Sequence, residues 1–468
     1  MSLPFSTKKL FPPELPLAAP GPGPVKLLRS LPMLRAHPLH YIQDAIDQYG
    51  DIVQFHLGGM NAFLINHPGY IQQVLQDKNQ NYSKDTIQYN ALSAVTGRGL
   101  LTSDGAEWLE HRRLMQPAFH RQQIYSFGPS ITEATQKMLR GWDRMAASGE
   151  IIDIDQAMLR LALEILVKAL LGKDLSDGAT ELTTSVLTVL DHIVSQVKSP
   201  PSIPAFIPTP ANRRYQTAMR SLDRAVFEII RDHQAEPTMA PDDLLSRLIR
   251  AGEGRDRPIL NPRQLRDEVI TMLIAGHETV ASALTWTCYL LSQNPQAEEC
   301  VWKELKRVLG GRSPSVDDLP ALDYTRRVFD EALRLYPPAW LITRKCIRKD
   351  EIGGYRIPAG SLVVIGVSAM HHHPGFWPEP DAFDPDRFTP ERSAQRPNFA
   401  YLPFGGGPRL CIGKPFALTE APLILAAIYQ RYRLELAAKS PVEVMPLVTL
   451  RPRGGMLMKV IPAGIQPA

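Results

Sequence analysis

Residues 404–413 read Phe-Gly-Gly-Gly-Pro-Arg-Leu-Cys-Ile-Gly, and this stretch decides the fold. Its glycines permit positive φ angles and let the backbone come very close to a flat partner. Its single thiol, Cys411, would bind a soft metal as a thiolate, and Arg409 carries a fork that fits a carboxylate. A planar cofactor that bears carboxylates and holds iron meets all three conditions, and haem is such a cofactor. The alternative is a glycine-rich turn around a buried structural cysteine.

The length and composition of the chain indicate one large globular domain. Its 468 residues exceed the usual size of a single domain, but neither a composition break nor a flexible linker divides them. We therefore predict one cofactor-organised domain over residues 1–468, in which residues 1–24 form a proline-rich leading segment. The net charge of +4 is too small for this length to indicate nucleic-acid binding.

Cysteine and histidine usage gives no sign of a second metal site. The four cysteines form no CxxC pair, so neither zinc nor a disulfide framework is indicated, and a reducing cytoplasm is expected. The histidines of residues 371–373 are expected to pack or to face solvent. The first ten residues hold no apolar run, so we expect a soluble cytoplasmic protein without a membrane anchor.

The apolar periodicity predicts a mainly α protein with small β-sheets, of the α+β class. Strand-like pieces occupy residues 51–57 and 61–65, and residues 105–345 are mainly helical. Residues 352–367 are expected to form a hairpin, residues 415–431 a helix, and the region through residue 460 a set of terminal strands.

The longest predicted helix is also the best specified. Asn261 can cap it, Pro262 suits its first turn and Gln264 completes a capping box. Its apolar pattern continues until Asn294-Pro295 ends it, which corresponds to about 48 Å. A helix so long and so apolar must lie in the core.

A polar group interrupts this helix at Ala275-Gly276-His277-Glu278-Thr279. Gly276 lowers helix stability by about 1 kcal/mol relative to alanine, which suggests a close approach or a local bulge. Burying a carboxylate and a hydroxyl is expensive without a purpose. The alternative is a polar pair that faces solvent.

The pattern Phe-x-x-Gly-x-Arg-x-Cys-x-Gly over residues 404–413 resembles the haem-thiolate loop of the cytochrome P450 superfamily, and the chain is similar to its soluble bacterial members. The resemblance implies that haem b, iron protoporphyrin IX, lies between the long central helix and the helix after the loop. Cys411 would be the iron ligand, and Phe404, Arg409 and Gly413 would lie around it.

The resemblance also assigns roles outside the loop. Thr279 would hydrogen-bond dioxygen and Glu278 would relay protons toward it, while Ala275 and Gly276 would lie over the haem. Trp108 and Arg112, one turn apart, resemble the family's propionate clamp, and Arg344 stands in the place of another propionate arginine. The alternative for each arginine is a surface residue that reaches into solvent.

An acid–base pair follows in Glu331-Ala332-Leu333-Arg334, which by itself means little because most such pairs are solvated. With Arg387, this pair resembles the family's buried charge triad, whose role is structural. The family pattern usually has Glu where this chain has Asp386.

The resemblance implies a monooxygenase that hydroxylates or epoxidises a hydrophobic small molecule, such as a fatty acid, a terpenoid or a steroid-like compound. A haem-thiolate peroxygenase or isomerase and, more remotely, a haem-based sensor are the alternatives. Candidate substrate contacts by family position are Tyr89, Leu92, Val95, Ile274, Ala275, Trp340, Leu341, Leu447 and Val448.

Electrons must come from elsewhere, because the chain carries no flavin or iron–sulfur module and hence no fused reductase. A separate ferredoxin or flavodoxin with an NAD(P)H reductase is implied. Arg112, Arg113 and Lys414 are candidates for its docking surface, since small redox partners are usually acidic.

Overall fold

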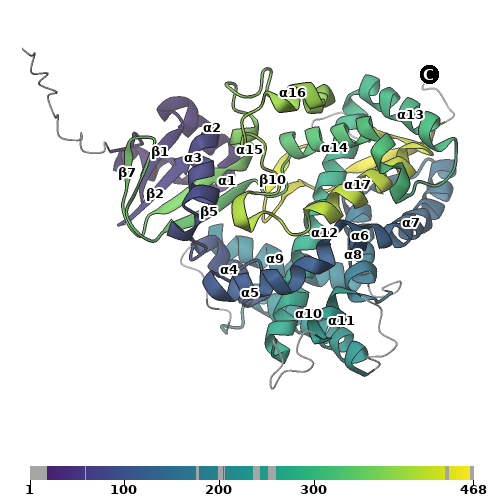
Figure 1. Ribbon diagram of the computed structural model, residues 1–468, viewed down its shortest axis with the longest axis horizontal. Helices are drawn as coiled ribbons and strands as arrows, with labels where there is room; N and C mark the ends of the chain where they lie inside the picture. The colour runs from purple at the N-terminus through teal and green to yellow at the C-terminus, as the bar shows by residue number, and fades with distance from the viewer. Residues whose placement is uncertain are drawn as a thin grey trace, which may run out of the picture.

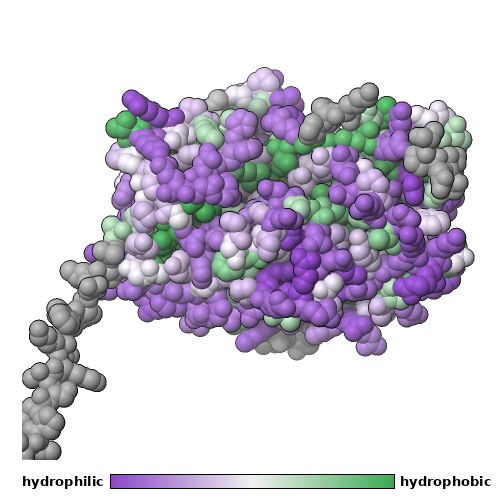
Figure 2. Space-filling model, turned by 90° about the horizontal axis from the view of Figure 1, so that it is seen from above, coloured by the Kyte–Doolittle hydropathy of each residue, from purple (hydrophilic) through white to green (hydrophobic). Residues whose placement is uncertain are grey.

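The computed structural model describes residues 18–57, 59–174, 179–198, 204, 206–235, 243–250, 260–437 and 442–463. Most of the proline-rich leading segment therefore lies outside the described residues. The structure is mainly helical with small sheets (Figure 1), so the predicted fold class is confirmed. Among the described residues, none of the helices combines the length and apolar composition of a membrane span. The face seen in Figure 2 is mostly hydrophilic, broken by small groups of hydrophobic residues.

The helices are α1 Pro24–Ala36, α2 Pro38–Tyr49, α3 Pro68–Gln72, α4 Ile87–Thr96, α5 Gly105–Met115, α6 Arg121–Ser126, α7 Gly128–Ser148, α8 Ile154–Leu171, α9 Ala179–Lys198, α10 Pro210–Ala235, α11 Leu244–Arg250, α12 Pro262–Gln293, α13 Pro295–Leu309, α14 Asp323–Leu335, α15 Val367–His371, α16 Pro390–Ala394 and α17 Lys414–Tyr429. The strands are β1 Ile52–Leu57, β2 Met60–Ile65, β3 Tyr82–Ser83, β4 Ile151–Asp153, β5 Leu341–Cys346, β6 Asp350–Ile352, β7 Tyr355–Ile357, β8 Leu362–Gly366, β9 Tyr432–Leu436, β10 Val444–Pro446, β11 Leu450–Pro452 and β12 Leu457–Pro462.

Helix α12 runs through the middle of the molecule, as its sequence predicts (Figure 1). The Asn261 side chain accepts a hydrogen bond from the Gln264 amide, and the Gln264 side chain accepts one from the Asn261 amide, each at 3.0 Å. The helix ends at Gln293, directly before Asn294-Pro295. Apolar side chains cover it on nearly every side, with α8, α10, α14 and α17 packed against it.

The largest sheet has the strand order β1-β2-β8-β5-β3. Strands β2 and β8 are parallel and the other neighbours are antiparallel. The predicted hairpin over residues 352–367 is only partly present. Gly353 and Gly354, both with positive φ, turn β6 into β7, while β8 leaves this pair and joins β2 and β5. Two successive strands in a pattern need not pair, because alternation marks the buried face and not the partner.

A separate sheet joins strands from the C-terminal part of the chain to β4, which lies about 300 residues earlier. Strand β12 lies between β4 and β9, so Lys459 pairs with both Ile151 and Glu435. Strand β11 pairs with β10, and the Leu450 carbonyl accepts hydrogen bonds from the Ser282 hydroxyl at 2.6 Å and the Trp286 indole at 2.9 Å. The C-terminal part of the chain is thereby fixed to the central helix.

Candidate haem site

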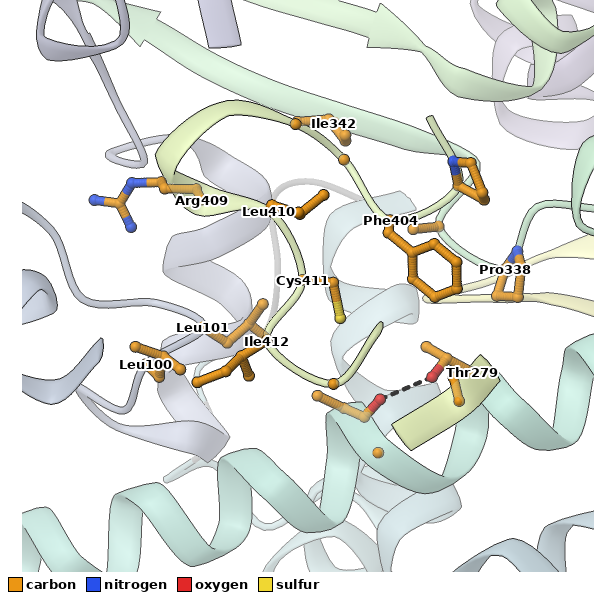
Figure 3. A pocket seen from close by; sticks show the side chains of 18 of the residues that line it. Leu100, Leu101, Thr279, Pro338, Ile342, Phe404, Arg409, Leu410, Cys411 and Ile412 are labelled. Atoms are coloured by element: carbon orange, nitrogen blue, oxygen red, sulfur yellow. Dashed lines mark hydrogen bonds between the residues drawn. The ribbon is translucent and has the colours of Figure 1, made fainter. Parts of the chain in front are cut away.

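A cavity of about 300 Å³ lies between α12 and the loop that precedes α17. The Cys411 sulfur and the Thr279 side chain both lie at it, from opposite sides (Figure 3). The loop is closed by a hydrogen bond from the Cys411 amide to the Phe404 carbonyl, at 3.0 Å. Residues far apart in the sequence, from Leu75 to Ala417, meet at this one space.

The thiol of Cys411 lies in a polarised setting. Burial raises its pKa, while the amides of Gly413 and Lys414 and the charges of Arg112 and Lys414 act in the opposite direction. Amide N–H groups directed at a sulfur stabilise its thiolate. The backbone amides of the loop thus favour the thiolate form of Cys411, which is the form that binds a metal ion.

The three consecutive glycines at residues 405–407 of the loop have different functions. Gly405 has φ +70°, and a Cβ there would meet only the Ile342 side chain, at 3.8 Å, so its open side faces the cavity. At Gly406 a Cβ would lie 2.2 Å from the Phe399 ring, and at Gly407 it would lie 1.9 Å from the Leu75 carbonyl oxygen. Of these three, Gly405 leaves room for a flat partner, whereas the other two let the loop pack on the protein.

On α12, the lining positions are spaced by one turn. Ala275 and Gly276 line the cavity, followed by Thr279, whose hydroxyl donates a hydrogen bond of 2.8 Å to the Ala275 carbonyl (Figure 3). A Cβ on Gly276 would lie 2.7 Å from a methyl group of Leu166 on α8. The glycine therefore permits the close approach of α8. Gly276 also lines the cavity, so its place over the haem stays a prediction.

Glu278 is buried but is not among the residues that line the cavity. Burial raises its pKa to about 7, against the opposing effect of the Arg451 guanidinium. His277, also buried, donates from Nδ1 to the Leu273 carbonyl at 2.6 Å, and its pKa is lowered to about 4 by burial. His277 is a neutral structural neighbour, and Glu278 exchanges its proton near neutral pH.

Basic side chains gather at one end of the cavity. Arg112 donates to the Leu410 carbonyl at 2.9 Å, and Arg344 donates to the Thr343 carbonyl at 2.8 Å. Arg409 lies 4.2 Å over the Trp108 ring and pairs with Asp104. Figure 3 shows Arg409 directed away from the sulfur, toward the edge of the site.

Sequence reasoning missed a fourth cation, Lys84. It is buried, its ammonium donates to the Leu101 carbonyl at 2.7 Å, and it lies 4.7 Å over the Tyr89 ring. Burial lowers its pKa well below the usual value, and the charges of Arg344 and Arg409 lower it further. Lys84 belongs to no motif, so only the fold reveals it.

These residues fit a haem. The described lining residues include a thiol on one wall, apolar side chains elsewhere and four cations at one end, but no Asp or Glu. Like charges gathered in a buried site repel one another unless an anion joins them. A flat apolar group with carboxylates on one edge supplies those anions and places its centre toward Cys411. The fit concerns Cys411, Arg112, Arg344, Arg409 and Lys84.

The predicted charge triad is assembled behind the loop. Arg334 forms two hydrogen bonds with the Glu331 carboxylate, at 2.7 and 2.8 Å, and neither side chain is exposed. Arg387 approaches the same carboxylate at 3.3 Å and donates to the Pro378 carbonyl at 2.6 Å. Asp386 lies at the surface, where it pairs with Arg327. The usual Glu at that position is therefore not needed for the buried set.

The buried His371 supports this region by packing. Its Nδ1 donates to the Arg334 carbonyl at 3.1 Å, and its Nε2 accepts from the Leu402 amide at 2.9 Å. Among the described residues, no group of three or more His, Cys, Asp and Glu side chains forms a metal-binding cluster.

Two of the nine predicted substrate contacts lie at this cavity, and the others stay predictions. Tyr89 and Ala275 line the cavity, but Leu92, Val95, Ile274, Trp340, Leu341, Leu447 and Val448 do not. Leu92, Val95 and Ile274 are core residues, and Trp340 lines a separate cavity of about 680 Å³. The lining positions that sequence reasoning missed include Leu101, Met272, Val280, Ala283, Ala339 and Ile342. Adjacent positions on a helix point about 100° apart, so an error of one residue moves a side chain out of the site.

Comparison with known proteins agrees with this geometry. The family model for Cytochrome P450 matches residues 19–459. The chain is 36% identical over 448 residues to cyclooctatin synthase of Streptomyces melanosporofaciens, covering 96% of this chain and 95% of that protein. It is 34% identical over 429 residues to cyclooctat-9-en-7-ol 5-monooxygenase of the same organism, covering 91% and 92%. The crystal structure of the cytochrome P450DA heme domain superposes with a TM-score of 0.85 at 26% identity, covering 96% of this chain and 98% of that one.

A match of this length includes the cysteine loop and the central helix, which are parts that line the cavity. The chain belongs to the cytochrome P450 family and is a monooxygenase with a haem-iron cofactor.

Proposed function

We propose that the protein uses haem b to hydroxylate or epoxidise an uncharged terpenoid, with electrons from a separate ferredoxin or flavodoxin and its NAD(P)H reductase. One observation carries this proposal: the Cys411 sulfur and the Thr279 side chain lie on opposite sides of one cavity. A thiolate on one side and a hydroxyl on the other is the arrangement that dioxygen activation requires.

The bound haem supplies oxygen activation, which a thiolate ligand favours by donating electron density to iron. The chain's own residues provide the rest. Cys411 would anchor the group through its sulfur, and Arg112, Arg344, Arg409 and Lys84, which line the same cavity, would hold its carboxylates. Thr279 offers a hydroxyl above the centre of the site, and Glu278, next to it on α12, holds an exchangeable proton.

Two observations favour an uncharged substrate over a fatty acid. The described lining residues on the α12 side of the cavity, such as Met272, Val280 and Ala283, carry no charge, while the four cations lie where haem carboxylates would fit. A fatty-acid carboxylate would compete for those cations. The relative named for cyclooctat-9-en-7-ol acts, by that name, on an unsaturated alcohol without a charged group. A terpenoid skeleton satisfies both conditions.

We place the docking surface of the redox partner beside the cysteine loop, so that electrons have a short path to the haem site. Arg113 is exposed on α5, next to the cavity residue Arg112, and Lys414 begins α17 directly after the loop. Arg112 itself is half-buried and faces Leu410, so we remove it from the proposed docking surface. Arg113→Glu should reduce the partner-supported rate and its salt dependence, because charge steers association. An unchanged rate and salt dependence would exclude this surface.

The experiment that tests the function has two stages. The reduced, carbon-monoxide-bound protein should show the red-shifted main band of a thiolate-ligated haem, and Cys411→Ser should lack it. Purified protein with a ferredoxin, its reductase and NADPH should then oxidise cyclic terpenoid alkenes or alkenols in preference to fatty acids of similar size. A parent protein without the red-shifted band would overturn the proposal, and preferential oxidation of fatty acids would overturn its substrate class.

A further inference from the structure

Helix α12 presents two threonines to the cavity, and their hydroxyl groups differ in their partners. Thr279 donates to the Ala275 carbonyl at 2.8 Å. Thr271 lines the same cavity and is 1% exposed, and its Oγ1 atom has no hydrogen-bond partner among the described residues. Thr271 therefore holds a buried polar group that the described part of the chain leaves unsatisfied.

The other buried threonines in the second half of α12 behave differently. Thr285 and Thr287 each donate to the carbonyl four residues earlier, at 2.8 and 2.7 Å. Such a bond is open to any threonine inside a helix. For Thr271 the acceptor would be the Asp267 carbonyl, but the described contacts include no bond between them. The Thr271 hydroxyl is thus not committed to its own helix.

This hydroxyl lies where α12 meets the segment that precedes α5. A Cβ on Gly99 would lie 2.1 Å from the Thr271 Oγ1 atom, so the two backbones pack closely there. Leu100 and Leu101 follow Gly99 and line the cavity, and the Leu100 amide donates to the buried Glu268 carboxylate at 3.0 Å. The hydroxyl therefore belongs to a wall of the cavity that is fixed from both sides.

The surroundings of the hydroxyl define the ligand that would satisfy it. Buried polar groups are as a rule hydrogen-bonded, to the protein, to water or to a ligand. Leu100, Leu101 and Met272, the neighbouring lining residues, are apolar. A ligand at this place gains one hydrogen bond and otherwise meets hydrocarbon, which is the setting that recognises a single oxygen on an apolar skeleton.

We propose that Thr271 is a specificity-determining residue that hydrogen-bonds an oxygen already present on the substrate. This inference rests on the proposed function and narrows its substrate class from uncharged terpenoids to terpenoid alcohols. The substrate hydroxyl completes the hydrogen bonding of Thr271, and a hydrocarbon of the same skeleton leaves that group unpaired. A site of this kind rejects the analogue that lacks the oxygen.

The position of Thr271 also bears on where the new oxygen enters. Thr271 precedes Thr279 by about two turns of α12, or about 12 Å along its axis. Figure 3 shows Leu100, which lies beside the Gly99 contact, and Thr279 at opposite ends of the site. A skeleton held at Thr271 by its oxygen therefore offers a carbon distant from that oxygen at the Thr279 end.

The first test asks whether the hydroxyl is free, and it needs no ligand. Thr271→Val should leave the melting temperature of the substrate-free holoenzyme unchanged or raise it, because it removes a buried polar group that has no partner. Thr285→Val is the matched control and should lower the melting temperature, because it removes the bond to the Ala281 carbonyl. Equal losses in the two variants would show that the Thr271 hydroxyl has a partner inside the folded protein, and would overturn the proposal.

The same variant tests whether the hydroxyl serves the haem instead of the substrate. Haem transfer from Thr271→Val to an apo-globin acceptor should be as slow as transfer from the parent. A faster loss of haem would assign the hydroxyl to a haem carboxylate and would also overturn the proposal.

The second test measures discrimination with pairs of cyclic terpenoids that share one carbon skeleton, such as menthol with p-menthane and cedrol with cedrane. The shift of the haem absorption band on binding gives a Kd for each compound. The ratio of hydrocarbon Kd to alcohol Kd should fall by about tenfold in Thr271→Val, and Thr271→Ser should restore most of it. Thr285→Val, which is not among the described lining residues, should keep the parent ratio. Equal ratios in the parent and Thr271→Val would overturn the proposal.

Product analysis checks the orientation of the bound alcohol. With a ferredoxin, its reductase and NADPH, the parent should place the new oxygen on a carbon that is not adjacent to the first. A vicinal diol as the main product would contradict the placement of the substrate oxygen at Thr271.

These outcomes separate the inference from the function on which it rests. If the parent oxidises terpenoid alcohols and hydrocarbons alike, and Thr271→Val does too, the function stands and the inference is wrong. If the parent binds no terpenoid, the proposed substrate class fails, while the melting temperatures still decide whether the Thr271 hydroxyl is free for a ligand.

Discussion

The Arg334 guanidinium meets the Glu331 carboxylate through two hydrogen bonds, at 2.7 and 2.8 Å, in a place where neither side chain is exposed. Arg334 also donates to the carbonyls of His371, Pro380 and Ala382. Thus α14 is fixed to the segment that leads into the cysteine loop. The pair is a structural link between a helix and a loop, and it carries no cofactor atom.

Glu331→Gln should lower the free energy of unfolding by about 3–5 kcal/mol, since it leaves two buried guanidinium groups without their counter-charge. Haem content should fall together with the melting temperature. The matched control is Glu299→Gln, at an exposed i, i+4 pair with Lys303, where a much smaller loss is expected. Chemical denaturation measures both variants. Equal losses in the free energy of unfolding would show that the buried Glu331 pair stabilises the protein no more than an exposed pair does.

Gly276→Ala should destabilise the protein although alanine favours helices. The new methyl group would lie 2.7 Å from Leu166, and overpacking costs about 1–3 kcal/mol. Leu166→Ala should relieve part of that contact in the double variant. At Gly141 of α7 a Cβ meets nothing within 4 Å, so Gly141→Ala should stabilise by up to about 1 kcal/mol. Denaturant titration of the four variants distinguishes crowding from propensity.

Lys84→Met should weaken haem retention, because it removes one of the charge-assisted hydrogen bonds that we assign to the haem carboxylates. The expected loss is about 1–3 kcal/mol in the free energy of haem binding. Arg113→Met, at the exposed neighbour of Arg112, should leave retention unchanged. Haem transfer to an apo-globin acceptor measures the difference, and equal rates for parent and Lys84→Met would remove Lys84 from the site.

The pH dependence of stability should carry the signature of Glu278. The folded state keeps its proton up to a pKa of about 7, whereas the unfolded chain loses it near 4.5, so this residue makes stability fall as pH rises between those values. Glu278→Gln should therefore gain on the parent by up to about 3 kcal/mol across that range. Urea unfolding at pH 4.5 and pH 8 measures the gain. A constant difference between the two proteins would mean that Glu278 titrates normally.

The features that the sequence predicted correctly are those formed by residues close together in the chain. The cap of α12, its end before Pro295 and the closed cysteine loop depend on residues within a few positions of one another. Capping boxes and glycine-rich loops can therefore be recognised along the sequence.

What could not be predicted depends on distant neighbours. The direction of Glu278 is set by β11, which lies about 170 positions later in the chain. The space at Gly407 is set by the Leu75 carbonyl, and the role of Lys84 depends on its burial near Arg344 and Arg409. No spacing within one segment encodes these relationships, because tertiary packing brings the partners together.

The anchoring of β11 on α12 through the Leu450 carbonyl also bears on how the protein is made. Chains fold broadly in the order in which they leave the ribosome. Helix α12 emerges long before Cys411, Leu450 and the strand β12 that closes the sheet with β4. During synthesis α8 and α10 are therefore available to α12 from the start, whereas the face of α12 that packs on β11 is covered only when the last strands emerge.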